Sequence, residues 1–210
     1  MKKILEYLNE TRKKEKALLV FTVIIFISGV VLGSLFINLI TKDDKILLIN
    51  QVQTYIDNIK KLSDSVFGIK YLGSEILNNI IQLFMIFSLG ISMIGIPAVI
   101  IILFFKGFTL GTTLSSIILK YKIKGILGCF FYVFPVMIIN IVIYIFFSFF
   151  AVSAAIKFLK ALFRKSSLDF KNFFGRYILL FLTSVLLISL TCILDSYLTP
   201  LLLKLFTFII

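Results

Sequence analysis

Long uncharged runs separated by short charged segments dominate the chain. An α-helix rises 1.5 Å per residue, so about 20 apolar residues are needed to cross the roughly 30 Å hydrocarbon core of a bilayer. The pattern predicts an all-α, polytopic membrane protein that forms a single integral membrane domain over residues 1–210. The five expected spans cover approximately residues 17–41, 76–105, 107–124, 125–149 and 177–198.

The boundary between the second and third spans has two interpretations, because the run from 76 to 105 is long for one crossing. The chain either turns at Gly95 to Pro97, which leaves Lys106 inside the third span, or it turns at Lys106 and Gly107. A lysine at the centre of a span costs about 2.5–3.5 kcal/mol on insertion scales. We therefore favour the second arrangement, with Lys106 near the inner membrane interface.

The segment 42–75 is the only sizeable hydrophilic part expected on the outer side of the membrane, and its apolar residues recur at three- and four-residue steps. This spacing predicts an external amphipathic helix with a single apolar face. One interpretation is that the face lies on the bilayer or on the ends of the spans. The other is that it docks an extracytoplasmic partner. The candidate docking residues are Ile49, Val52, Ile56 and Ile59.

The net charge of +12 is concentrated near the N-terminus and in the segment 157–176. Lys157, Lys160 and Arg164 lie on one side of a helical pattern, which predicts a basic interfacial helix on the inner leaflet. Lysine and arginine next to apolar runs are typical of cytoplasmic segments, so we expect a multi-pass protein of the cell membrane with a cytoplasmic N-terminus and an extracytoplasmic C-terminus. This distribution favours contact with the lipid bilayer and argues against nucleic acid.

The composition excludes most hydrolytic chemistry. Hydrophobic residues make up 60% of the chain and charged residues 15%, and histidine is absent. Without histidine, neither a Ser-His-Asp triad nor an H-E-x-x-H zinc site is available. The acidic residues Glu75, Asp169 and Asp195 belong to different loops or span ends and are not expected to pair. We therefore expect no enzyme activity, no catalytic residues, no metal and no cofactor.

Small residues recur at helical spacing in two of the spans. Gly29 and Gly33 form one G-x-x-x-G motif, and Gly107 and Gly111 form another. Such motifs let helix backbones approach closely. We favour internal packing over a dimer interface, although the sequence leaves an oligomer open.

The region 78–116 contains a recognisable pattern. It includes the paired asparagines Asn78 and Asn79, the pair Leu89-Gly90, the G-I-P stretch that runs from Gly95 to Pro97, and KGFTLGTTLSS from Lys106 onward. These motifs, the basic N-terminal block and the long first span resemble the stage II sporulation protein M family. The resemblance assigns a structural motif role to Asn78, Asn79, Gly90, Gly95, Pro97, Lys106, Gly107 and Gly111.

The resemblance implies a non-catalytic membrane protein of the engulfment machinery. In that family's sporulation members, the protein localises and stabilises two peptidoglycan-degrading partners, stage II sporulation proteins P and D, at the septal membrane. The mother-cell membrane then migrates around the forespore. A scaffold of a peptidoglycan remodelling complex is accordingly the favoured function.

Two other functional classes remain. A transporter or permease subunit is suggested by the Gly- and Pro-interrupted segments near residues 90–111, because transporters build binding sites at broken helices. Against it, the sequence offers no convincing inverted repeat and no set of polar residues within the spans. An intramembrane enzyme that uses a Ser/Lys pair is the least favoured class.

Overall fold

The computed structural model describes residues 2–61, 67–92, 95–133, 136–164 and 170–209, and it describes side chains at 15–54, 73–92, 95–130, 136–161, 163 and 171–198. These residues form seven α-helices. They are α1 (Lys2–Leu39), α2 (Lys42–Lys61), α3 (Phe67–Ile91), α4 (Gly95–Tyr121), α5 (Ile123–Val133), α6 (Val136–Arg164) and α7 (Phe170–Ile209).

Five of these helices contain segments long and apolar enough to cross a membrane. The segments are Glu15–Leu39, Gly73–Ile91, Gly95–Tyr121, Val136–Ala161 and Lys171–Leu198. They belong to α1, α3, α4, α6 and α7. The prediction of an all-α, multi-pass membrane protein is confirmed, although several predicted boundaries are not.

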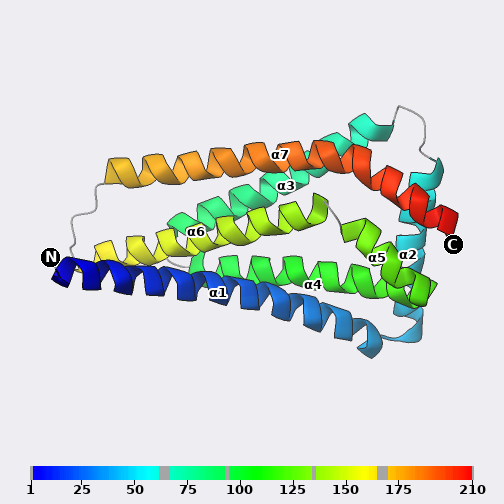
Figure 1. The fold of residues 1–210 in the computed structure, drawn as a ribbon, viewed down its shortest axis with the longest axis horizontal. Helices are drawn as coiled ribbons and strands as arrows, with labels where there is room; N and C mark the ends of the chain where they lie inside the picture. The colour runs from blue at the N-terminus through cyan, green and yellow to red at the C-terminus, as the bar shows by residue number, and fades with distance from the viewer. Residues whose placement is uncertain (1, 62–66, 93–94, 134–135, 165–169, 210) are drawn as a thin grey trace.

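The five long helices form an elongated bundle, and α2 lies across the end opposite to the chain's N-terminus (Figure 1). The C-terminus is at the same end as α2 (Figure 1). Helix α6 is central because it contacts α1, α3, α4 and α7. The apolar core lies around Tyr144, Phe147 and Ala151 of α6, which pack against Leu83 and Ile86 of α3.

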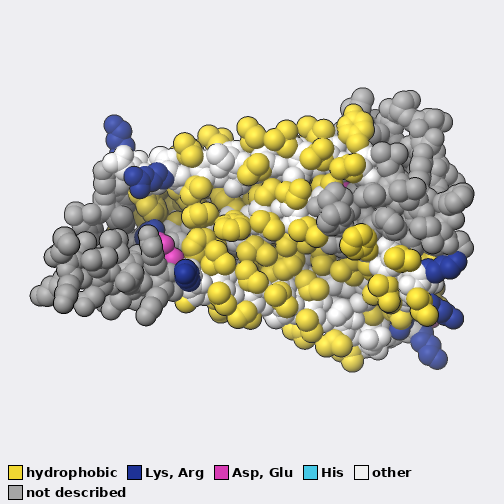
Figure 2. Space-filling model, in the orientation of Figure 1, with side chains coloured by type: hydrophobic (Ala, Val, Ile, Leu, Met, Phe, Trp, Pro, Cys, Tyr) yellow, Lys and Arg dark blue, Asp and Glu magenta, His cyan; other side chains and the backbone are white. Residues whose placement is uncertain are grey.

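Large apolar side chains also cover the outside of the bundle. Figure 2 shows them as a broad band along its length, with lysine and arginine gathered toward the two ends. Ile24, Ile101, Leu182 and Leu186 are each more than half exposed. Soluble monomers rarely expose apolar patches of such extent, whereas lipid tails solvate them well. The surface therefore has the character expected of a lipid-facing bundle.

The favoured turn at Lys106 and Gly107 is wrong. The chain turns between Ile91 and Gly95, and α4 then runs without interruption through Lys106. Pro97 is in the first turn of α4, where a helix needs no N–H donor, so proline starts this helix instead of breaking it. The second span consequently ends at Ile91, and Lys106 lies midway along the third.

The expected span 125–149 is also displaced. A separate short helix, α5, covers its first part, and the membrane-spanning segment begins only at Val136. Lys122, with a positive φ of 53°, ends α4 and reverses the chain toward α5. Pro135 lies outside the described residues, between α5 and α6.

The basic segment 157–176 is divided between two long helices. Lys157 and Lys160 extend α6, which ends at Arg164, and α7 begins at Phe170. Residues 165–169 lie outside the described part of the chain. A helix that continues past the hydrocarbon keeps its backbone hydrogen bonds, so the change from apolar to basic residues does not require a new element.

The two G-x-x-x-G motifs pack against each other between α1 and α4. A Cβ atom added at Gly29 or Gly33 would collide with the backbone carbonyl of Phe104 or Phe108. The contact is reciprocal, because a Cβ at Gly107 would collide with the carbonyl of Phe26. This is the internal packing that the sequence favoured over a dimer interface.

We predict that Gly107→Ala destabilises the protein. The added methyl group meets backbone, which cannot rotate away, so α1 and α4 must separate at a cost of about 1–3 kcal/mol. The melting temperature in detergent should fall, as should the amount of protein in the membrane.

The matched control is Gly175→Ala in α7, because a Cβ there meets nothing within 4 Å. This substitution should be neutral, or stabilising by up to about 1 kcal/mol through helix propensity. Equal melting temperatures for the two variants would contradict the close α1–α4 contact.

Candidate functional site

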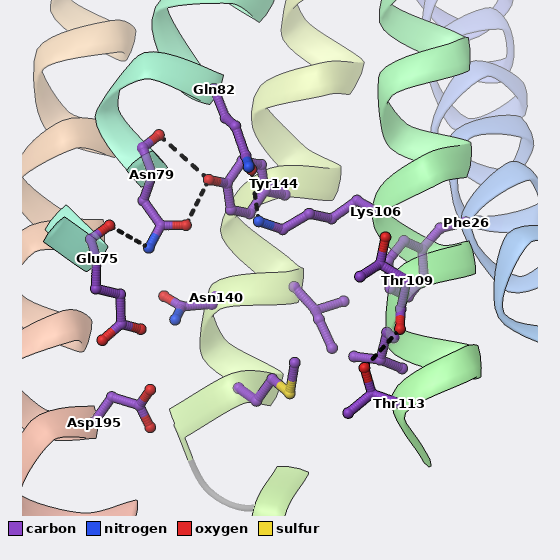
Figure 3. Close-up of a pocket in the computed structure, with 13 residues that line it drawn as sticks. Phe26, Glu75, Asn79, Gln82, Lys106, Thr109, Thr113, Asn140, Tyr144 and Asp195 are labelled. Carbon is purple, nitrogen blue, oxygen red and sulfur yellow. Dashed lines mark hydrogen bonds between the residues drawn. The ribbon is translucent and has the colours of Figure 1, made fainter. Parts of the chain in front are cut away.

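A polar cavity of about 280 Å³ lies inside the bundle, and its lining comes from all five membrane-spanning helices. Thirteen residues line it (Figure 3). The polar and charged ones are Glu75, Asn79, Gln82, Lys106, Thr109, Thr113, Asn140, Tyr144 and Asp195. Polar side chains within membrane spans are costly unless they pair or face a water-filled space, so they mark candidate functional sites.

Lys106 of α4 provides the cation of the site. Its Nζ donates a hydrogen bond of 2.6 Å to Gln82 Oε1 on α3. The same ammonium lies 4.2 Å from the centre of the Tyr144 ring on α6, a cation–π contact. These contacts compensate the charge within the span, which is why the chain tolerates a lysine midway along α4.

Asn79 connects three helices around the cavity. Its Oδ1 accepts a 2.8 Å hydrogen bond from the Tyr144 hydroxyl, while its Nδ2 donates to the Glu75 carbonyl at 3.0 Å and to Cys192 Sγ at 3.3 Å. Both ends of the amide are therefore used, which holds the side chain in one orientation. Asn79 thus links α3 to α6 and to α7.

A second polar link joins α6 to α7. The Thr191 hydroxyl donates to Asn140 Oδ1 and also to the carbonyl of Ile188 in its own helix. Thr191 is buried, and Asn140 lines the cavity. Interhelical hydrogen bonds of this kind stabilise membrane bundles by about 0.6 kcal/mol on average.

The carboxyl groups of Glu75 and Asp195 lie close to each other on one side of the cavity (Figure 3). They interact electrostatically, and Glu75 also interacts with Lys106. Among the described residues, Glu75 Oε2 is a buried oxygen without a hydrogen-bond partner. The sequence-based expectation that these acids stay apart is wrong, because α3 and α7 pack side by side and bring two distant parts of the chain together.

The sequence did contain a signal for this site. Glu75, Asn79 and Gln82 recur at i, i+4 and i+7, so they form a polar stripe on one face of α3. Asn140 and Tyr144 are likewise four residues apart on α6. The expectation that the spans lack a set of polar residues is therefore wrong.

The other motif residues do not line the cavity. Asn78 is exposed, unlike its neighbour Asn79. Gly90 is buried against the Tyr177 hydroxyl, and Gly95 against the carbonyl of Leu89 at the α3–α4 turn. Side chains larger than glycine would collide at both positions, so these glycines permit close approach.

The predicted docking face lies on α2, away from the cavity. Ile49 and Val52 are half-buried, and α2 contacts α4 and α7. The side chains of Ile56 and Ile59 lie outside the described residues. The docking role of these four residues stays a prediction.

We predict that Lys106→Met destabilises the bundle, because it removes the hydrogen bond to Gln82 and takes away the cation that interacts with the Glu75 carboxyl group. Loss of a hydrogen bond to a charged group costs about 1.5–3 kcal/mol. Adding Glu75→Gln to Lys106→Met should recover part of the loss, with a coupling free energy of about 0.5–3 kcal/mol in detergent unfolding.

Lys120→Met is the control, because Lys120 is an exposed lysine of the same helix. It should change the free energy of unfolding little. Strictly additive effects of Lys106→Met and Glu75→Gln would contradict an energetic link between the two side chains.

A protein-family model matches most of the chain. The model of the family described as "Stage II sporulation protein M" matches residues 22–200. This range includes four of the five membrane-spanning segments completely and the first one from residue 22 onward. No curated protein and no solved structure matches the chain. Because the family match extends over most of the sequence, the chain belongs to the stage II sporulation protein M family.

Proposed function

We propose that this sporulation membrane protein is a non-catalytic scaffold that recruits and stabilises peptidoglycan-degrading partners at the septal membrane during forespore engulfment. The observation that carries the proposal is the family match over residues 22–200. The partners are stage II sporulation proteins P and D, as the family resemblance implies. Five apolar helices provide the membrane anchor for such an assembly.

The proposed orientation has the N-terminus in the cytoplasm and α2 outside, on the side of the peptidoglycan. Lys16, Lys157, Lys171 and Arg176 lie near the bundle end that carries the N-terminus. This agrees with the preference of lysine and arginine for the cytoplasmic side. The basic residues at this end outnumber the lysine cluster over residues 120–124 at the opposite end.

Helix α2 offers an accessible apolar surface for an extracytoplasmic partner. Ile46 and Leu47 are 55% and 61% exposed, whereas Ile49, one turn from Ile46 on the same face, and Val52 are half-buried. Apolar anchors that a partner can cover contribute most of the binding free energy at protein interfaces. The exposed pair is therefore the part of α2 most suited to docking.

We predict that Ile46→Asp combined with Leu47→Asp disperses fluorescently labelled partners from the septum and arrests engulfment. The reason is that a carboxylate buried in an apolar interface without a partner is strongly unfavourable. Microscopy of sporulating cells measures partner position, and immunoblotting of membranes checks that the variant accumulates.

The matched control is Asn50→Asp combined with Gln51→Asp, which adds the same charge at exposed polar positions of α2. It should leave the partners at the septum. Normal partner localisation in the Ile46→Asp/Leu47→Asp cells would contradict docking at α2. Normal localisation in cells that lack the whole chain would contradict the scaffold function itself.

A second candidate function is movement of a proton or monovalent cation across the membrane, and the polar cavity favours it. One lysine and two carboxyl groups line the cavity, so the three groups carry a net charge of −1 when all are ionised. A net charge in a low-dielectric interior is costly, and binding one small cation removes it. Transporters often place such sites between helices near the middle of the bilayer.

The transport function predicts that the purified protein in proteoliposomes dissipates an imposed pH or sodium gradient, as measured with an enclosed fluorescent dye. Glu75→Gln should abolish the flux, whereas Asn78→Gln, at an exposed neighbouring position on α3, should retain it. Equal gradients in liposomes with and without the protein would exclude this candidate and leave the scaffold function unaffected.

A further inference from the structure

A second cavity, of about 420 Å³, opens between α6 and α7. It lies where α6 approaches its C-terminal end and α7 begins, at the end of the bundle that also carries the chain's N-terminus (Figure 1). Its polar lining includes Lys157, Arg176, Ser153 and Asn172. Among the described residues, the lining contains two cations and neither aspartate nor glutamate.

The lining changes from basic to apolar along the bundle axis. Phe150 lies two helical turns deeper in α6 than Lys157, and Leu180 lies about one turn deeper in α7 than Arg176. At 1.5 Å per residue these steps are about 10 Å and 6 Å. A ligand with an anionic head and an apolar body matches this order of surfaces.

The inner wall of the cavity is held in place by tertiary contacts. Tyr177 is buried, and its hydroxyl donates to the Phe87 carbonyl at 3.1 Å. Its ring stacks on Phe87 at a centroid distance of 4.8 Å and on Phe147 at 6.4 Å. A wall fixed in this way loses little conformational freedom when a ligand binds.

We propose that this α6–α7 groove binds the headgroup of an anionic phospholipid. The phosphate lies between Lys157 and Arg176, and the acyl chains follow Phe150 and Leu180 into the bilayer. Arginine suits this position because its planar guanidinium presents several donors to phosphate oxygens, and Ser153 supplies a hydroxyl donor. Basic pockets between membrane helices are a recurrent means of binding anionic lipid headgroups.

The test is native mass spectrometry of the full chain in detergent, titrated with phosphatidylglycerol or with phosphatidylcholine. The unmodified protein should retain phosphatidylglycerol preferentially, and added salt should weaken that binding. The variant Lys157→Gln/Arg176→Gln should bind phosphatidylglycerol about thirtyfold more weakly, which corresponds to roughly 2 kcal/mol for two cations.

The control variant is Lys120→Gln/Lys122→Gln, which removes the same charge from exposed positions at the opposite end of the bundle. Its affinity for phosphatidylglycerol should stay close to that of the unmodified protein. Circular dichroism and melting temperature show whether each variant is folded, and the salt dependence of the unmodified protein tests the site without any substitution.

Three results would overturn the proposal. Equal binding of phosphatidylglycerol and phosphatidylcholine would exclude selection by headgroup charge. Equal losses in the two double variants would mean that net charge, and not the groove, determines binding. Displacement of the lipid by inorganic phosphate at comparable concentration would identify a free phosphate site that makes no use of the apolar wall.

Discussion

The positive charge of Lys106 inside an apolar bundle is the constraint on which the arrangement of the helices depends. A lysine midway along a span is unfavourable by itself, and here it is balanced by Gln82, the Tyr144 ring and the carboxyl group of Glu75. Those partners come from α3 and α6, and the Asp195 carboxyl group comes from α7. The helices must therefore pack with their polar stripes facing inward, which creates the cavity.

The close contact of α1 with α4 supports the same arrangement from the other side. Glycines on both helices remove the side chains that would separate the backbones, so α4 lies directly against α1. With that face of α4 covered, Lys106 is directed away from α1 and toward α3 and α6. Phe26 of α1 takes part in both features. Its backbone carbonyl lies against Gly107, and the residue also lines the cavity, so the α1–α4 glycine contact lies directly beside the polar site.

The three candidate functional surfaces are spatially separate. The polar cavity is inside the bundle, α2 lies across the end opposite to the N-terminus, and the basic groove between α6 and α7 opens near the N-terminal end. In the proposed scaffold, one end would contact extracytoplasmic proteins and the other would interact with lipid headgroups. The cavity then gives the bundle a specific polar interior, or a path for a small cation in the second candidate function.

The sequence by itself determined the fold class, the number of spans, the amphipathic α2 and the family, because these depend on local hydropathy and on short motifs. It also identified the glycine motifs, although only the tertiary structure paired Gly29 and Gly33 of one helix with Gly107 and Gly111 of another. The turn before Gly95 and the meeting of Glu75, Lys106 and Asp195 were decided by tertiary contacts. Judged from the sequence, a lone lysine is excluded from a span by the free-energy cost of inserting its charge. In the folded bundle, partner side chains from other helices offset that cost. Those partners lie far apart in the sequence and meet only when the chain folds.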